Sequence, residues 1–124
     1  MNLIERLFGG HRKAGNGGSH TWTGQSGKEY QYQIHPLGMV FKPEPANYIL
    51  CSEAEGGGWV PLYIAQTRDV HQRLEGSENQ EHAMQQGATH IHVHLASGSQ
   101  AARCTEERDL ILRWRPVCNE PIEG

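Results

Sequence analysis

A predicted helix over residues 100–114 carries the first group that could do chemistry. Spacings of three and four residues place on its apolar face Cys104, Glu107, Ile111 and Trp114. A carboxylate in an apolar stripe must be paired or bound to a cation, because an isolated buried charge is very costly. Glu107 is therefore a candidate cation ligand, although helix geometry alone favours another interpretation. The competing interpretation is a border residue that reaches water or pairs with Arg103 one turn earlier. The neighbours expected to face solvent are Glu106, Arg108 and Asp109.

Three histidines alternate along a predicted strand over residues 89–95. His90, His92 and His94 share one face of this strand, and the apolar residues between them face the core. A His-x-His pair on a strand can bind zinc when a third ligand comes from elsewhere. No Cys, Asp or Glu follows at ligand spacing, so the pattern favours a polar sheet face that is solvated or covered by another segment. A zinc site on the three histidines remains an alternative.

Two tyrosines lie in neighbouring predicted strands. Tyr48 falls within residues 47–51 and Tyr63 within residues 59–65, and a short Gly-rich loop between the strands predicts an antiparallel hairpin. Pro61 lacks an N–H group, which places an edge or a bulge near the start of the second strand. The two rings can then meet across the ladder. By themselves such tyrosines are usually core or rim aromatics.

The elements that must position these residues follow from hydrophobic periodicity and from the punctuating Gly and Pro residues. In chain order they are a strand over 28–34, a short extended piece at 40–41, the hairpin, a short helix after Asp69 that carries Arg73, a helix over 78–86, the strand over 89–95 and the helix over 100–114. This order predicts an α/β fold of the α+β type, a small central and mostly antiparallel sheet flanked by helices. Residues 1–27 hold 7 of the 15 glycines and are expected to be a flexible arm with a short helix at 2–8. The ordered domain is expected over residues 28–124.

Five short segments in this order resemble the GIY-YIG nuclease superfamily, which includes homing endonucleases, some restriction enzymes and the incision module of bacterial excision repair. They are Asn47-Tyr48-Ile49, Tyr63-Ile64-Ala65-Gln66-Thr67, Asp69-Val70-His71-Gln72-Arg73, Glu107-Arg108-Asp109-Leu110-Ile111 and Pro116-Val117-Cys118-Asn119. The resemblance covers residues 46–120, and the family fold agrees with the predicted element order. The chain departs from the family at Asn47 and Ala65, where the motifs have glycine.

The resemblance implies a role for each matching residue. Tyr48 and Tyr63 match the tyrosines of the two named motifs, one of which acts as general base toward water. Arg73 matches the arginine that contacts the scissile phosphate, and Glu107 matches the glutamate that binds a single divalent cation, Mg²⁺ or Mn²⁺. Asn119 matches the asparagine that braces the site. A histidine found in several members corresponds to His71 or His82, and the spacing does not choose between them.

Elementary chemistry supports the same set. Phosphodiester hydrolysis needs an activated water, a cation on the phosphate oxygens and a positive group for the developing charge. A carboxylate oxygen suits Mg²⁺ better than zinc. A tyrosine with an ordinary pKa near 10 is a poor base at pH 7, so the cation or Arg73 must favour its phenolate. The expected activity is a metal-dependent endonuclease. The alternative is an inactive member of the fold that binds nucleic acid or protein.

Charge and cysteine content limit the partners and the compartment. With 11 Lys and Arg against 14 Asp and Glu, the net charge of -3 excludes a generally basic coat protein for nucleic acid. Six of the basic residues nevertheless fall near the proposed site, namely Arg68, Arg73, Arg103, Arg108, Arg113 and Arg115. Five of them, all except Arg73, are expected to hold the phosphates of DNA, with RNA not excluded. Three scattered cysteines indicate a reducing cytoplasm, and a mean hydropathy of -0.66 without a long apolar run predicts no membrane segment.

Overall fold

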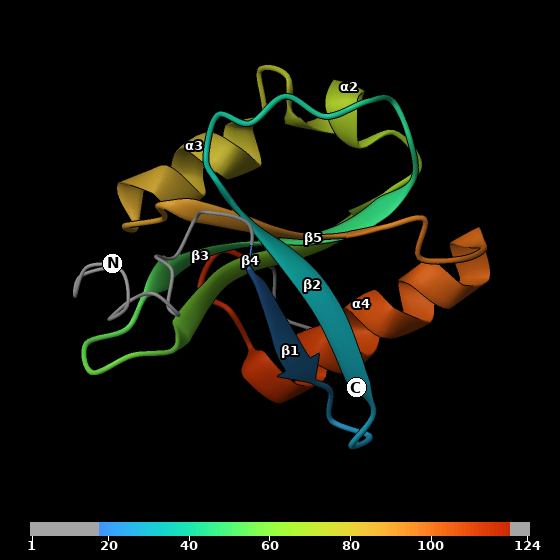
Figure 1. Cartoon of the computed structure of the whole chain (residues 1–124), viewed down its shortest axis with the longest axis horizontal. Coiled ribbons are helices and arrows are strands. Elements are labelled where there is room, and N and C mark those ends of the chain that lie inside the picture. The colour runs from blue at the N-terminus through green and yellow to red at the C-terminus, as the bar shows by residue number, and fades with distance from the viewer. Residues whose placement is uncertain (1–17, 120–124) are drawn as a thin grey trace, which may run out of the picture.

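The computed structural model describes residues 18–119, which form one five-stranded sheet with helices on both faces (Figure 1). Along the chain the elements are β1 (Ser19–Thr23), β2 (Glu29–Pro36), β3 (Ala46–Glu53), β4 (Trp59–Thr67), α2 (Val70–Leu74), α3 (Glu78–Gln85), β5 (His90–Leu95) and α4 (Gln100–Trp114). The strand order is β1-β2-β5-β3-β4, and every neighbouring pair is antiparallel. The predicted α+β fold is therefore confirmed.

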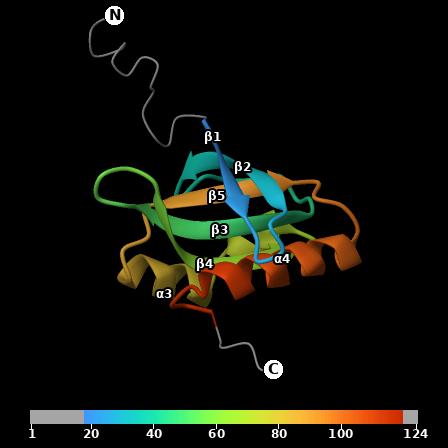
Figure 2. The ribbon, with the colours of Figure 1, turned by 90° about the horizontal axis from the view of Figure 1, so that it is seen from below.

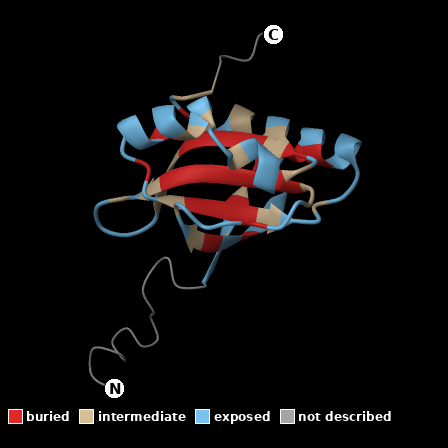
Figure 3. Ribbon diagram, turned by 90° about the horizontal axis from the view of Figure 1, so that it is seen from above, coloured by how far each residue is buried: buried red, intermediate tan, exposed pale blue. Residues whose placement is uncertain are grey.

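The sheet lies between two helical layers. Helices α2 and α3 cover one face and α4 covers the other, above and below the sheet in Figure 1. Figure 2 shows the same elements from below. Because side chains alternate along a strand, Tyr48 packs with Val70 and Ala83 on the α2/α3 face, and the next residue, Ile49, packs with Leu110 of α4. The central strands are buried along most of their length (Figure 3). Successive side chains of β3 therefore lie in the two different cores, and the strand fixes the position of both.

Strands β3 and β4 form the predicted hairpin, with β4 at the edge of the sheet. The register between them shifts between Leu50 and Cys51, opposite Pro61, which confirms the expected irregularity. The connecting loop reverses the chain through residues 56–58, three glycines with positive φ, a conformation that other residues rarely adopt. This hairpin brings Tyr48 and Tyr63 to neighbouring strands.

The helices begin at the residues that the sequence predicts. The Asp69 side chain accepts a hydrogen bond of 2.9 Å from the Gln72 amide at the start of α2. The Ser99 hydroxyl accepts one of 3.1 Å from the Ala102 amide at the start of α4. Helix α4 ends at Arg115, whose positive φ of 47° reverses the chain. These caps fix the entry of α2 after β4 and of α4 after β5.

The ordered domain begins earlier than predicted. Strand β1 pairs with β2 and lies within residues 1–27, which were expected to be a flexible arm. Trp22 is 1% exposed and meets Trp114 edge-on, so buried aromatic surface offsets the ordering entropy of this Gly-rich segment. The predicted helix at 2–8 lies outside the described residues.

A second correction concerns the connection between β2 and β3. Residues 40–41 were expected to form a short extended piece, and they form no strand. Phe41 is nevertheless buried in the core on the α2/α3 face, so the apolar residues there serve packing rather than sheet pairing. No helix within residues 18–119 is long and apolar enough to cross a membrane.

Candidate active site

Tyr48 and Tyr63 lie on the same face of the β3–β4 hairpin. Their ring centroids are 6.3 Å apart and their planes meet at 53°. Tyr48 is fully buried, whereas Tyr63 retains a small exposed fraction at the edge strand. The hairpin register therefore brings the two tyrosines together, as the sequence predicts.

Arg73 reaches these tyrosines from α2. Its Nη2 donates to the Tyr63 hydroxyl oxygen at 3.3 Å, and its Nη1 donates to the Gln66 carbonyl at 3.4 Å. Both bonds are long for N–H···O hydrogen bonds, and the side chain is exposed. The guanidinium therefore lies beside the tyrosines while keeping donors available for another group.

Glu107 approaches the same place from α4. Its side chain is half-buried, and among the described residues it forms no salt bridge. Burial raises its pKa, although the Gln66 backbone amide and the charge of Arg73 pull the pKa in the opposite direction. A half-buried carboxylate without an ion-pair partner fits a single divalent cation that keeps water or phosphate oxygens as its remaining ligands.

The hydroxyl group of Tyr48 is the least satisfied polar group of this cluster. It is buried and makes no hydrogen bond to the described residues, which is unusual for a buried tyrosine. Burial raises its pKa well above the usual range, and the nearby charge of Arg73 partly opposes that shift. The phenol is therefore protonated at neutral pH, and Arg73 lies close enough to affect its pKa without reaching hydrogen-bond geometry.

The carboxyl-terminal segment closes the hairpin edge. Asn119 clasps the backbone of Ile64, because its Oδ1 accepts from the Ile64 amide and its Nδ2 donates to the Ile64 carbonyl, both at 2.8 Å. The Cys118 amide donates to the Leu62 carbonyl at 2.9 Å. Asn119 and Cys118 together thus hold the strand on either side of Tyr63, and Asn119 does not belong to the tyrosine cluster itself.

The structure joins neither candidate histidine to the cluster. His71 is exposed on α2, and its Nδ1 lies 3.0 Å from the Phe41 carbonyl. His82 is exposed on α3. Among the described residues, neither makes a hydrogen bond to Tyr48 or Tyr63.

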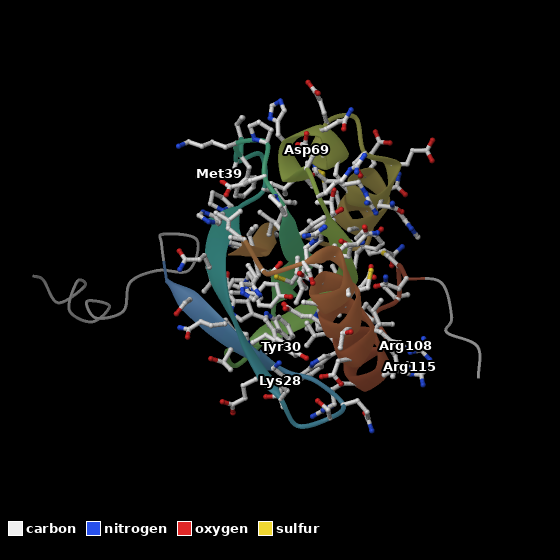
Figure 4. The ribbon with its side chains drawn as sticks, turned by 90° about the vertical axis from the view of Figure 1, so that its right-hand side faces the viewer. Lys28, Tyr30, Met39, Asp69, Arg108 and Arg115 are labelled. Carbon is white, nitrogen blue, oxygen red and sulfur yellow. The ribbon has the colours of Figure 1, made fainter. Side chains whose placement is uncertain are left out.

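Four of the five arginines expected to bind phosphate are exposed, and these are Arg68, Arg108, Arg113 and Arg115. Arg108, on α4, and Arg115, directly after its end, project on the same side in Figure 4. Arg103 was expected on the surface as well, and this is wrong: it is 6% exposed and bonded to groups inside the protein. Arg68 and Arg73 line an open cleft of about 530 Å³ at the end of β4.

The face assignment of the last helix also needs correction. The buried residues of α4 are Arg103, Glu106 and Leu110, whereas Cys104 is exposed. Glu106, expected in solvent, is held below the sheet by the Tyr32 hydroxyl at 2.6 Å and lies 2.8 Å from His94 Nδ1. The buried face of α4 differs from the predicted apolar face because polar partners on the sheet accommodate these charged residues.

The three histidines of β5 do not form a metal site. His92 is fully buried, and its Nδ1 accepts a hydrogen bond of 3.0 Å from Trp22 Nε1, so of the two expected arrangements the face is covered by another segment rather than solvated. His94 lies against Glu106 instead of the other histidines. Within residues 18–119 no group of three or more His, Cys, Asp or Glu side chains is arranged to hold a metal ion. Strand β1 and helix α4 cover this face, so its polar groups lie inside the protein.

Asn47 and Ala65, which stand where the motifs of the similar family have glycine, are both buried. Asn47 is buried on the α4 face, opposite to Tyr48, where its Nδ2 donates to the Arg103 carbonyl at 3.0 Å. Ala65 is buried and pairs with Tyr48 in the ladder. Asn47 therefore points away from the tyrosines, whereas Ala65 lies on their face, directly across the ladder from Tyr48.

The chain matches no family model, no curated protein and no solved structure. A functional interpretation of the protein therefore depends on the geometry of this cluster. One residue that sequence reasoning did not single out is Gln66, whose backbone contacts Arg73 and whose side chain contacts Arg103. Its place directly after Tyr63-Ile64-Ala65 was the available signal.

Proposed function

We propose that the protein is a metal-dependent endonuclease of the GIY-YIG type that hydrolyses phosphodiester bonds of DNA. The observation that carries the proposal is the cluster of Tyr48, Tyr63 and Arg73 from three different elements, with the Tyr48 hydroxyl outside hydrogen-bond geometry and the charge of Glu107 near enough to affect the pKa values of Tyr48 and Arg73. A buried phenol without a partner costs folding energy, so a role toward a substrate or a water molecule explains its retention.

Each side chain supplies one requirement of hydrolysis. As the phenolate, Tyr48 would accept the proton of the attacking water. Its own proton must first pass to solvent, and the positive charge of Arg73 and of a cation at Glu107 would favour that loss. Arg73 already donates to Tyr63 and has further N–H groups for a phosphate oxygen, where negative charge increases during the reaction. Tyr63 orients the guanidinium, and Asn119 holds the strand that carries Tyr63.

Glu107 is the residue that would hold a divalent cation, Mg²⁺ or Mn²⁺. Such a cation, when bound, stabilises the charge on the phosphate and makes nearby water and phenol groups more acidic. Glu107 fits this role because it offers an oxygen ligand close to Arg73 and forms no salt bridge within the described chain. The raised pKa of Tyr48 makes such assistance necessary for a base at neutral pH.

The DNA backbone would be held by arginines that surround the cluster without belonging to it. Arg68 and Arg73 line the cleft at the end of β4, and Arg108, Arg113 and Arg115 are exposed along α4. Arg113 lies 4.4 Å from the Trp114 ring, an arrangement that keeps its guanidinium in a defined orientation. Local charge of this kind binds phosphate although the chain as a whole carries a net charge of -3.

The proposal is tested by single-turnover cleavage of duplex, branched and single-stranded DNA and of RNA, with Mg²⁺ or Mn²⁺ and with chelator. Tyr48→Phe keeps the ring and removes the hydroxyl, so the rate should fall by about 10²–10⁴-fold with little change in stability. The matched control is Tyr32→Phe, which removes another buried hydroxyl that bonds Glu106 instead. Full activity in Tyr48→Phe would remove this tyrosine from the mechanism. An inactive parent that still binds nucleic acid would favour the binding-module alternative.

A further inference from the structure

Arg103 lies at the centre of a buried polar cluster between α4 and the β3–β4 hairpin. Its Nε donates to Gln66 Oε1 at 3.0 Å, and its Nη1 donates to the Gly98 carbonyl at 2.7 Å. The Arg103 carbonyl accepts a hydrogen bond of 3.0 Å from Asn47 Nδ2. We refer to Asn47, Gln66, Gly98 and Arg103 as the Arg103 brace. It ties one turn of α4 to both strands of the hairpin.

Burying the Arg103 guanidinium to attach α4 costs free energy of desolvation. A buried guanidinium needs a full set of acceptors, and among the described residues Arg103 forms no salt bridge. Apolar residues of similar volume at such positions are often as stabilising or more so. The cluster therefore needs an explanation besides the stability of the fold.

The groups on the far side of Gln66 supply that explanation. The Gln66 carbonyl accepts from Arg73 Nη1 at 3.4 Å, and the Gln66 amide is close enough to the Glu107 carboxyl to affect it. Glu107 follows Arg103 by one helical turn, so both side chains leave α4 toward β4. The Gln66 residue thus connects Arg103 to the two charged groups of the candidate site.

We propose that Arg103 is a positioning residue that sets the separation between Glu107 and Arg73 through Gln66. The inference rests on the proposed function, because it assigns the Arg103 brace to that same site. It also gives Asn47 a purpose where the family motif has glycine. A glycine has no side-chain amide to hold the Arg103 carbonyl, so this chain has added a contact that fixes α4 against β3.

The test uses the full chain and compares Arg103→Lys and Arg103→Met with Arg113→Lys and Arg113→Met. Lysine keeps the charge at residue 103 but cannot donate to Gln66 and Gly98 with the same fork. We expect both Arg103 variants to lower the NMR order parameter of the Arg73 Nε–H group in the metal-free protein. They should also lower kcat for cleavage by about tenfold or more while KM for DNA changes little. The Arg113 variants should leave the order parameter unchanged.

A second variant, Gln66→Met, removes the side-chain acceptor and keeps the volume, and it serves if Arg103→Met does not fold. Its effect on Arg73 order should not add to that of Arg103→Lys, because both break the same contact. Additive effects, or an Arg103→Lys variant with the Arg73 order and turnover of the parent, would overturn the positioning role. A parent that cleaves no substrate contradicts the proposed function, and the order measurement still decides whether Arg103 positions Arg73.

Discussion

Two adjacent carboxylates on α4 lie in very different surroundings. Glu106 is 4% exposed, and its Oε2 is within hydrogen-bond distance of the Tyr32 hydroxyl and of His94 Nδ1. Glu107 is half-buried, forms no salt bridge among the described residues and has a pKa raised by burial. The first carboxylate anchors the helix to the sheet. The second is held where its charge is costly.

The same contrast extends to the surroundings of each residue. On the α4 face, polar side chains are mostly bonded to the fold: Asp109 holds the turn before β2 by accepting from the Ser26 amide and hydroxyl at 2.9 and 2.7 Å, whereas His92 Nε2 is buried without a partner among the described residues. At the hairpin, the Tyr48 hydroxyl is also buried without a bond in the described chain, and Arg73 is tied only by long contacts. A polar group that the fold leaves unsatisfied lowers stability and needs an explanation, and for Tyr48 the neighbouring Arg73 points to chemistry.

Neutralising each carboxylate in turn is the most direct test of the difference between Glu106 and Glu107. Glu107→Gln should lower cleavage about a thousandfold, which equals about 4 kcal/mol of transition-state stabilisation, because an amide is a poor ligand for the cation. It should also raise the thermal midpoint at pH 7. A raised pKa means that folding disfavours the ionised carboxylate, so the neutral amide relieves a cost that is present above its ordinary pKa.

Glu106→Gln is the matched control. Its loss of the charge-assisted bonds to Tyr32 and His94 should lower stability by about 1–3 kcal/mol. The measurements are thermal unfolding and single-turnover cleavage on both variants. A Glu107→Gln protein that is less stable than the parent would show that the two carboxylates do the same structural work.

A second comparison separates the arginine in the cluster from one on the helix surface. Arg73→Met should lower the single-turnover rate by about 10²–10³-fold, because the guanidinium stabilises charge that develops in the transition state. Arg113→Met should weaken DNA binding and reduce the slope of log affinity against log salt by about one, with saturated turnover nearly unchanged. Equal effects of the two substitutions on turnover at saturating protein would contradict the assigned division of roles.

The element order and the helix starts could be predicted because local signals decide them. Period-two alternation, the Gly-rich loop of the hairpin, and the caps Asp69 and Ser99 each act within a few residues. The convergence of Tyr48, Tyr63 and Arg73 followed from hairpin register and the short α2, together with the family resemblance. The hairpin register and the position of α2 both follow from residues that are close together in the sequence.

What the sequence could not predict depends on partners distant in the chain. Arg103 and Glu106 look like solvent-facing residues until Gln66 and Tyr32 meet them from the sheet. The sequence left open whether the histidine face of β5 is solvated or covered, because the segment that covers it, β1, was expected to be part of a flexible arm. Periodicity identifies which residues share a face, but polar pairing across the sheet decides how a helix is rotated on it.

The last prediction sharpens the structural side of the comparison at His92, a buried polar group that the site does not use. Burial lowers its pKa to about 3, whereas the unfolded chain keeps the ordinary value near 6.5. The unfolded state therefore binds a proton that the folded state excludes as the pH falls, so stability is full above about pH 6.5 and declines toward pH 3. Urea unfolding at pH 7 and pH 4 should show a loss of stability that is smaller in His92→Gln by roughly 2–3 kcal/mol, because its side chain does not titrate. The loss that remains comes from groups such as His20 and His35, whose pKa values burial also lowers. The control is His82→Gln on the exposed face of α3, which should keep the parental pH dependence. If His92→Gln loses as much stability on acidification as the parent, the acid sensitivity belongs to the carboxylates and His92 is not the group that excludes the proton.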